Sequence, residues 1–358
     1  MQLPYLDFLP ALATHFTLAP TAAVVGRVSA GPGLVLREWA TLRADGEAIR
    51  IGADAFFAER STVHIVDSRL PAVLGAGATV GRYALVHACV LGDDVVVADA
   101  AVVMDGAEVG SGSLIAPGAL VAPRKALPGG GLYAGNPAVR VRDVAPAELA
   151  AAARAIRRGE ALPAVRDDDV PVLAGSADLA APGLAALRRG AAAGGAFVAP
   201  TALVAGDVAL ARDAGVYYAC RIDAGDAALA IGEGTNVQDN AILATSAAQG
   251  DLAIGRRVTI GHNVRMGAGR IGDDALIGMG AELAHGVVVE PGACVGGRAF
   301  VEPGTVVKTG WIWAGRPARA FREIRPADRE GFARAAEVYV RYSRNYLAAA
   351  SRRDVTSP

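Results

Sequence analysis

Large aliphatic residues recur every six positions along much of this 358-residue chain. The first long run consists of Leu91, Val97, Val103, Val109, Ile115 and Val121. Alanine or serine stands four positions after most of them. A period of six fits neither an α-helix nor an ordinary β-strand. It is typical of hexapeptide repeats, whose aliphatic and small residues point into the core of a parallel β-helix. The pattern therefore predicts a solenoid of short strands and turns.

The second half of the chain repeats the first at an offset of 180 residues. Residues 19–21 (APT) match residues 199–201 (APT), and residues 135–138 (GNPA) match residues 315–318 (GRPA). Both halves also shorten one step of the repeat from six residues to five at the same place. The shortened steps are Val86 to Leu91 and Met266 to Ile271. The chain is therefore predicted to be a tandem duplication of one β-helix domain.

Each predicted β-helix is followed by a helical tail that begins at a proline. The tails are residues 146–162 and 326–353, and proline suits the first position of a helix because that N–H has no partner. Residues 161–195 mix an acidic run with prolines and Ala/Gly clusters, which indicates a linker with one short helix near residues 184–190. We expect domains at 1–160 and 196–358, joined by this linker.

Composition gives no sign of a nucleic-acid or membrane partner. Lys and Arg total 35 against 36 Asp and Glu, a formal charge of -1, so there is no electrostatic case for binding polyanions. The first 16 residues lack a basic start and are interrupted by Pro4 and Pro10, and no later apolar run would span a bilayer. We expect a cytoplasmic protein. Its three cysteines are expected to be free, partly buried thiols; they are Cys89, Cys220 and Cys294.

Several strings are more specific than the hexads. They are IGEGTNVQDNAILAT (231–245), VTIGHNVRMG (258–267), LRADGEAIRIG (42–52) and VVMDGAEVG (102–110). Together they resemble the γ-class carbonic anhydrases and their bacterial and mitochondrial relatives, over roughly 19–160 and 199–350. The resemblance implies a left-handed β-helix that forms trimers. It also implies a divalent metal, usually zinc, held between neighbouring subunits by three histidines, two from one subunit and one from the other.

The three ligand positions of that family are divided between the two halves of this chain. The first half has His64, Arg82 and His87 there, and the second has Ala244, His262 and Gly267. The first and second positions are eighteen residues apart in both halves, one coil of three hexads, so we expect them to stack directly. Neither half has all three ligands, but His64, His87 and His262 together supply one of each. The hypothesis is a metal site between unlike domains, with Zn²⁺ favoured and Fe²⁺ or Co²⁺ possible alternatives.

Other residues of the family motif are divided in the same way. The first half keeps Arg43 and Asp45, and the second keeps Gln238 and Asp239. Arg43 and Asp45 align with Asp223 and Gly225 in the second half, and Gln238 and Asp239 align with Ala58 and Glu59 in the first. The resemblance implies that the glutamine lies near the metal-bound water and that the arginine and aspartates help to hold the interface. These four are the catalytic candidates.

Three classes of function compete. The first is a zinc-dependent lyase of carbonic anhydrase type, or an enzyme that uses the same site on a small carbonyl or thioester substrate. The second is a hexapeptide acyltransferase or CoA-thioester enzyme, although the hexads run from 254 to 307 without the insertion that would carry a catalytic histidine. The third is an inactive trimeric scaffold. In each case we expect a homo-oligomer built on trimeric rings, and rings that pair like domains would separate the three histidines.

Overall fold

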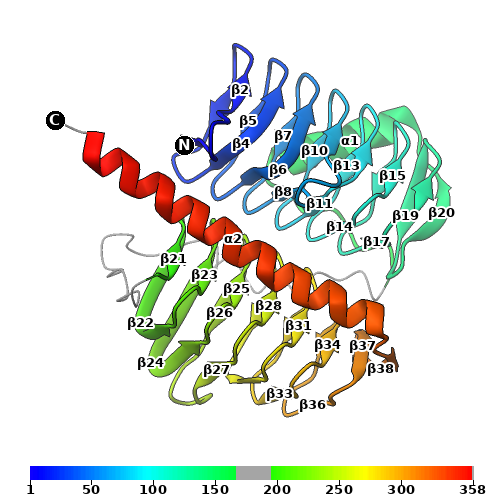
Figure 1. Ribbon diagram of the computed structural model, residues 1–358. Coiled ribbons are helices and arrows are strands. Elements are labelled where there is room, and N and C mark those ends of the chain that lie inside the picture. Colours follow the sequence, from blue (N-terminus) through cyan, green and yellow to red (C-terminus); the bar gives the residue numbers. More distant parts are fainter. Residues whose placement is uncertain (167–194, 357–358) are drawn as a thin grey trace. The chain divides into compact units, whose positions relative to one another are not determined.

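The computed structural model describes residues 1–166 and 195–356 and contains two compact units, Met1–Gly175 and Ser176–Pro358 (Figure 1). The predicted linker and its short helix fall almost entirely outside the described residues. Each unit is a β-helix of short, stacked strands followed by an α-helix, as the six-residue period predicts. The two units are described separately below.

The first unit has three faces of stacked strands. One face holds β8 (Thr62–His64), β11 (Leu85–His87), β14 (Val102–Val103) and β17 (Leu120–Val121). A second holds β9 (Ala72–Leu74), β12 (Val90–Leu91), β15 (Glu108–Val109) and β18 (Ala126–Leu127). The long strands β4 (Ala23–Ala30) and β6 (Thr41–Ile51) join these two faces, and β1 (Gln2–Leu3) and β2 (Ala11–Leu12) pair with β4.

The third face of the first unit is a separate sheet. It contains β3 (Thr17–Leu18), β5 (Val35–Leu36), β7 (Phe56–Phe57), β10 (Thr79–Val80), β13 (Val96–Val97), β16 (Leu114–Ile115), β19 (Gly131–Ala134) and β20 (Val139–Asp143). Neighbouring strands run parallel except for the last pair, β19 and β20, which is antiparallel and ends the solenoid. Successive strands on one face are therefore related by one full coil of the chain.

The second unit repeats this arrangement. One face holds β26 (Ile242–Ala244), β29 (Arg265–Met266), β32 (Glu282–Leu283) and β35 (Phe300–Val301). A second holds β27 (Leu252–Ile254), β30 (Gly269–Ile271), β33 (Val287–Val289) and β36 (Val306–Val307). The long strand β24 (Arg221–Ile231) joins these two faces and pairs with β22 (Leu203–Leu210). The third face holds β21 (Phe197–Val198), β23 (Gly215–Val216), β25 (Asn236–Val237), β28 (Thr259–Ile260), β31 (Leu276–Ile277), β34 (Cys294–Val295), β37 (Trp311–Gly315) and β38 (Ala318–Glu323). The strands β6 and β24 lie 180 residues apart at both ends, which confirms the duplication.

The hexad positions form the cores. In the first unit the six aliphatic residues of the run from Leu91 to Val121 are at most 2 % exposed, and the corresponding residues of the second unit, such as Ile260, Ile277 and Val295, are fully buried. Burying one such side chain contributes about 1.5–3 kcal/mol. Because each coil contributes several, the stacked coils share one continuous apolar core in each unit.

The helical tails begin where the prolines predict, but their lengths differ. Helix α1 (Pro146–Arg157) packs on β10 and β13 and buries Leu149, Ala152 and Ile156 along one side. It ends earlier than expected because Gly159 adopts a left-handed conformation (φ +80°), which closes the helix.

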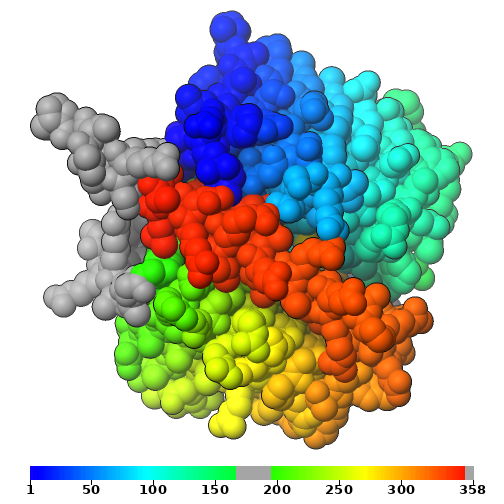
Figure 2. Space-filling model, in the orientation of Figure 1, coloured from blue at the N-terminus to red at the C-terminus, as the bar shows by residue number. Residues whose placement is uncertain are grey.

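Helix α2 (Pro326–Thr356) is much longer and packs along β21, β23, β25 and β28 of its own unit. Figure 2 shows it, in orange to red, laid over the green-to-yellow coils. The contact is aromatic: the Tyr217 ring meets Tyr339 edge to face at 4.9 Å, and the Tyr217 hydroxyl donates to the Tyr339 carbonyl at 2.7 Å. Across the described residues, no helix is both long enough and apolar enough to cross a membrane.

Candidate metal centre

His64 and His87 stand side by side on adjacent coils of the first unit. The parallel strands β8 and β11 pair so that His64 is in register with His87, and Arg43 on β6 is in register with His64 on its other side. The expectation that positions 64 and 82 stack directly was wrong. The coil between the two histidines contains a loop closed by the bridge between Val66 and Leu70, so the residue one coil beyond His64 is His87.

The two imidazoles face each other and each is held from behind by a carboxylate. Nδ1 of His64 lies 3.1 Å from Nε2 of His87. On the far sides of the rings, Nε2 of His64 is 3.0 Å from Asp45 Oδ1 and Nδ1 of His87 is 2.5 Å from Asp105 Oδ1. Arg43 forms a fully buried ion pair with Asp45. Both histidines are buried, at 2 % and 5 % exposed.

This arrangement constrains the hydrogens on the rings. An ionised carboxylate only accepts hydrogen bonds, so the imidazole nitrogen beside it carries the N–H. A neutral imidazole has one N–H and one lone pair, and the lone pairs of His64 Nδ1 and His87 Nε2 therefore point at each other. Two lone pairs 3.1 Å apart repel unless a proton or a metal cation lies between them. Two nitrogen ligands of a tetrahedral zinc ion, each about 2.0–2.1 Å from the metal, would be about 3.3 Å apart, so the pair fits a shared divalent cation.

In the second unit, His262 lies in the turn after β28 and is fully buried. Its Nδ1 is 3.3 Å from Asp239 Oδ2, which stands one coil earlier, and its Nε2 is 3.3 Å from the hydroxyl of Tyr339 on α2. Asp239 also accepts a hydrogen bond from the Tyr218 backbone N–H at 2.9 Å. Gln238, the residue before Asp239, is also buried, and its side-chain amide N–H donates to Asn236 Oδ1 at 3.1 Å.

Each unit thus brings its own predicted residues together: Arg43, Asp45, His64 and His87 in the first, and Asp239 and His262, with Gln238 next in sequence, in the second. Sequence reasoning missed two neighbours of the histidines, Asp105 and Tyr339. A signal for Asp105 was present, because it lies eighteen residues after His87 within the family-like string VVMDGAEVG. Tyr339 offered none: it is 77 residues from His262 and reaches it only because α2 folds back over the coils.

At the one family ligand position of the first unit that has no histidine, residue 82, the arginine forms an ion pair with Asp99. Arg82 donates to Asp99 from Nε at 2.9 Å, and its backbone N–H donates to the same carboxylate at 2.8 Å. The guanidinium is therefore held within its own unit. His15 and His285, which match no ligand position, are exposed.

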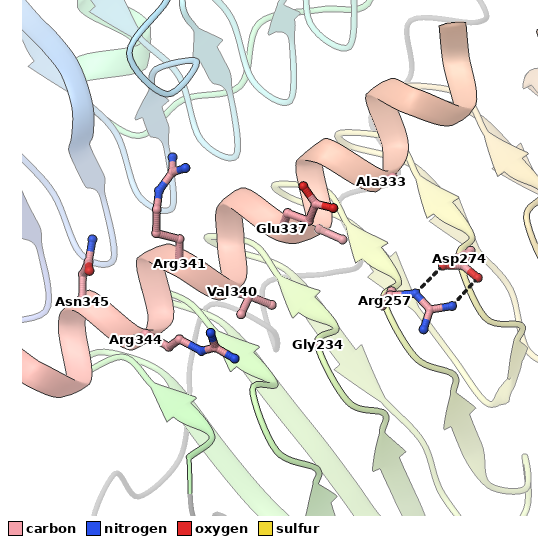
Figure 3. A pocket seen from close by; sticks show the side chains of 10 residues that line it. Gly234, Arg257, Asp274, Ala333, Glu337, Val340, Arg341, Arg344 and Asn345 are labelled. Atoms are coloured by element: carbon pink, nitrogen blue, oxygen red, sulfur yellow. Dashed lines mark hydrogen bonds and ion pairs between the residues drawn. The ribbon is translucent and has the colours of Figure 1, made fainter. Parts of the chain in front are cut away.

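A separate groove of about 540 Å³ lies between α2 and the coils of the second unit (Figure 3). Arg257 and Asp274 form an ion pair on one side of it with two N–H···O contacts of 2.7 Å, and Arg341, Arg344 and Glu337 project from the helix. None of the predicted catalytic or metal-binding residues lines it. The three cysteines are buried and none of them forms a disulfide, as predicted.

Comparison with known proteins identifies relatives for part of the chain. No family model matches. Gamma carbonic anhydrase 1, mitochondrial, of Arabidopsis thaliana is 40 % identical over 134 residues, which are 36 % of this chain and 49 % of that protein. The chain therefore spans about half the length of this relative. Protein YrdA of Escherichia coli is 30 % identical over 153 residues, 41 % of this chain and 83 % of YrdA.

Among solved structures, a hexapeptide transferase family protein from Anaplasma phagocytophilum is 35 % identical, over 43 % of this chain and 91 % of that protein, with a TM-score of 0.41. The identities to the Arabidopsis and Escherichia coli relatives agree with the six-residue repeat and the motif residues. The chain belongs to the γ-carbonic anhydrase-like family of hexapeptide-repeat β-helix proteins.

Proposed function

We propose that the chain is a metalloenzyme in which His64 and His87 of the first unit and His262 of the second hold one divalent metal ion, with zinc as the favoured ion. The proposed reaction is hydration of CO₂, or attack of water on a small carbonyl or thioester. The observation that carries the proposal is the pair of facing imidazole nitrogens of His64 and His87, 3.1 Å apart, each ring fixed from behind by a carboxylate. Carboxylate–histidine pairs of this kind are the usual outer shell of protein zinc sites.

Three imidazoles leave one coordination position of a zinc ion open, and the bound ion lowers the pKa of a water molecule there to about 7, which supplies hydroxide at neutral pH. The chain's residues would hold that geometry. Asp45 would keep the N–H of His64 on Nε2, and Arg43 in turn holds the Asp45 carboxylate in place through their buried ion pair. Because Arg43 is fully buried in this ion pair, we assign it and Asp45 a positioning role rather than contact with substrate.

In the second unit, a hydrogen on His262 Nδ1 would lie toward the Asp239 carboxylate, 3.3 Å away, and would leave the lone pair on Nε2. The ring edge that carries Nε2 would then face the metal, and the Tyr339 hydroxyl, 3.3 Å from Nε2, would border the same space. Gln238 is placed next to Asp239 and would offer its amide to the water or to the substrate. Substrate-orienting groups of this type lower a barrier by fixing geometry before the reaction.

The proposal requires a first unit and a second unit to be neighbours, either within one chain or between two copies in an oligomer built on rings of three units. Like-with-like pairing would instead place Arg82 beside His64 and His87. A guanidinium there would repel a metal cation, and Ala244 and Gly267 offer no ligand to the second unit's His262.

Metal content is the first test. Protein purified without chelator and dialysed should contain about one zinc per chain by plasma emission spectrometry. His64→Ala, His87→Ala and His262→Ala should each lose it, whereas His285→Ala, which removes an exposed imidazole of the second unit, should retain it. Retention of zinc by His262→Ala would refute the shared centre.

A second experiment separates unlike from like pairing. The variant Arg82→His gives the first unit all three ligands of the motif. If unlike units form the site, adding Arg82→His to His262→Ala will not restore the metal. Restoration of zinc and activity in that double variant would show that first units pair with each other.

The reaction is tested by CO₂ hydration in stopped flow beside hydrolysis of short-chain acyl-CoA thioesters. We expect the activity on one of these substrates to disappear in His87→Ala in proportion to the zinc lost. Zinc-loaded protein that is inactive on both substrates would favour the scaffold interpretation.

A further inference from the structure

We propose that Asp105 is the positioning residue for His87: it holds the ring as the Nδ1–H tautomer with Nε2 turned toward His64. The claim about the tautomer concerns the first unit alone, and its consequence for metal affinity rests on the proposed function. Asp105 lies in the turn directly after β14, and its carboxylate is the acceptor 2.5 Å from His87 Nδ1.

The two carboxylates behind the imidazoles sit in different surroundings. Asp45 is fully buried and paired with Arg43, so His64 is held by a carboxylate inside the unit. The Asp105 side chain is 37 % exposed, while the His87 side chain is 6 % exposed. Asp105 therefore holds a buried ring from the rim of the solenoid, where its substitution disturbs little packing.

The duplication supplies an internal comparison. In the second unit the position of His87 is Gly267 and the position of Asp105 is His285, so the imidazole and its carboxylate are both absent. The other histidine–carboxylate pair, His64 and Asp45, is likewise absent from the second unit, where Ala244 and Gly225 stand at the aligned positions. A carboxylate that served only the turn after β14 would have no reason to differ together with the residue at position 87.

Without the carboxylate, the ring of His87 could carry its hydrogen on Nε2. That hydrogen would point at His64 Nδ1, and His87 Nε2 would then have no lone pair with which to bind a metal. Outer carboxylates of this kind typically contribute about 10–100-fold to metal affinity. We therefore expect Asp105 to act on the metal through the tautomer of His87, without touching metal or substrate.

The test compares Asp105→Leu, which removes the acceptor, with Asp105→Asn, which keeps an acceptor oxygen without the charge. Glu108→Gln is the matched control, since Glu108 is an exposed carboxylate three residues away on β15. The first readout is the tautomer of His87 in metal-free protein, from two-bond ¹H–¹⁵N correlations of selectively labelled histidine; the chain has only five histidines. The second readout is the Co²⁺ dissociation constant and its visible absorption spectrum.

We expect His87 to carry a hydrogen on Nδ1 in the unsubstituted protein and in Glu108→Gln, whether or not a proton is shared between its Nε2 and His64 Nδ1, and to lose that preference in Asp105→Leu. Co²⁺ affinity should fall about 10–100-fold in Asp105→Leu and less in Asp105→Asn. Retention of the Nδ1–H tautomer and of full Co²⁺ affinity in Asp105→Leu would overturn the inference. If the unsubstituted protein bound no Co²⁺ or Zn²⁺, the proposed function would fail, and the tautomer measurement would still decide the role of Asp105.

Discussion

The buried ion pair of Arg43 and Asp45 allows a quantitative prediction. In Asp45→Asn the shape of the side chain is kept, and its amide oxygen can still accept from His64 Nε2–H. The negative charge is lost, and the Arg43 guanidinium is left uncompensated at a site where both side chains are 0 % exposed. Removing one partner of a buried pair costs about 3–5 kcal/mol. For a unit of this size that corresponds to a fall in melting temperature of about 6–20 °C.

The second unit provides the matched control. Asp223 occupies the position that aligns with Arg43 and pairs with Arg221 at 2.9 Å, but these side chains are 29 % and 27 % exposed. Water screens this pair, so Asp223→Asn should cost about 0–1 kcal/mol. The double variant Arg43→Met/Asp45→Asn removes both buried charges and should recover a large part of the loss.

The assay is thermal and urea unfolding in EDTA, which separates fold stability from metal binding. Trp39 is the one tryptophan of the first unit, and Trp311 and Trp313 are those of the second. Replacing Trp311 and Trp313 by Phe makes the fluorescence report on the first unit, which contains Asp45, and replacing Trp39 by Phe makes it report on the second, which contains Asp223. Equal destabilisation by Asp45→Asn and Asp223→Asn would refute the reasoning from burial.

Three further predictions concern α2 and the thiols. The Asp328 carboxylate accepts hydrogen bonds from the Arg322 side chain and from the Arg325 backbone N–H at the start of α2, and these contacts lower its pKa to about 2. Asp328→Ala should therefore cost about 1 kcal/mol, since it removes a side chain that satisfies a backbone N–H at the helix start. Because the pKa lies below the unfolded value of 3.8, this contribution should be complete above about pH 4 and vanish as the pH falls toward 2, as pH-dependent unfolding of the two proteins will show. Burial raises the pKa of the Cys294 thiol to about 12, so Ellman's reagent at pH 8 should label it only after unfolding, and rapid labelling of the native protein would contradict its burial. Tyr339→Phe keeps the ring contacts and removes one hydroxyl contact to His262. Zinc affinity should therefore fall by no more than about tenfold, while the melting temperature is unchanged. A large loss of stability would show that the hydroxyl serves the fold.

Much of the fold could be predicted from sequence because a solenoid is built from local repeats. Each hexad specifies one strand and one turn, and a coil contacts only its neighbours, so the six-residue period and the offset of 180 residues give the strands of both units. The predicted stacking of positions 64 and 82 failed for a local reason. The loop closed by Val66 and Leu70 lengthens one coil, and counting hexads cannot reveal how many residues leave the core at a loop.

The candidate site was only partly predictable. The motif residues Arg43, Asp45 and His64 lie close together because parallel strands in register bring equivalent positions of successive coils side by side. Asp105 was recognisable in principle because it lies eighteen residues after His87, within the family-like string VVMDGAEVG. The roles of these groups could not be predicted, because the sequence does not show which ring nitrogen of a histidine faces a carboxylate.

The sequence by itself determined that the chain is a duplicated hexapeptide β-helix and that its histidine motif is divided between the halves, since both follow from periodicity and alignment. Only the tertiary structure decided that His87, and not position 82, is the neighbour of His64, that Asp45 and Asp105 hold the two rings from behind, and that Tyr339 reaches His262. The physical reason is that ring orientation, tautomer and burial depend on contacts between coils and between a coil and α2. Those contacts join residues from 18 to 77 positions apart, beyond the reach of any local pattern.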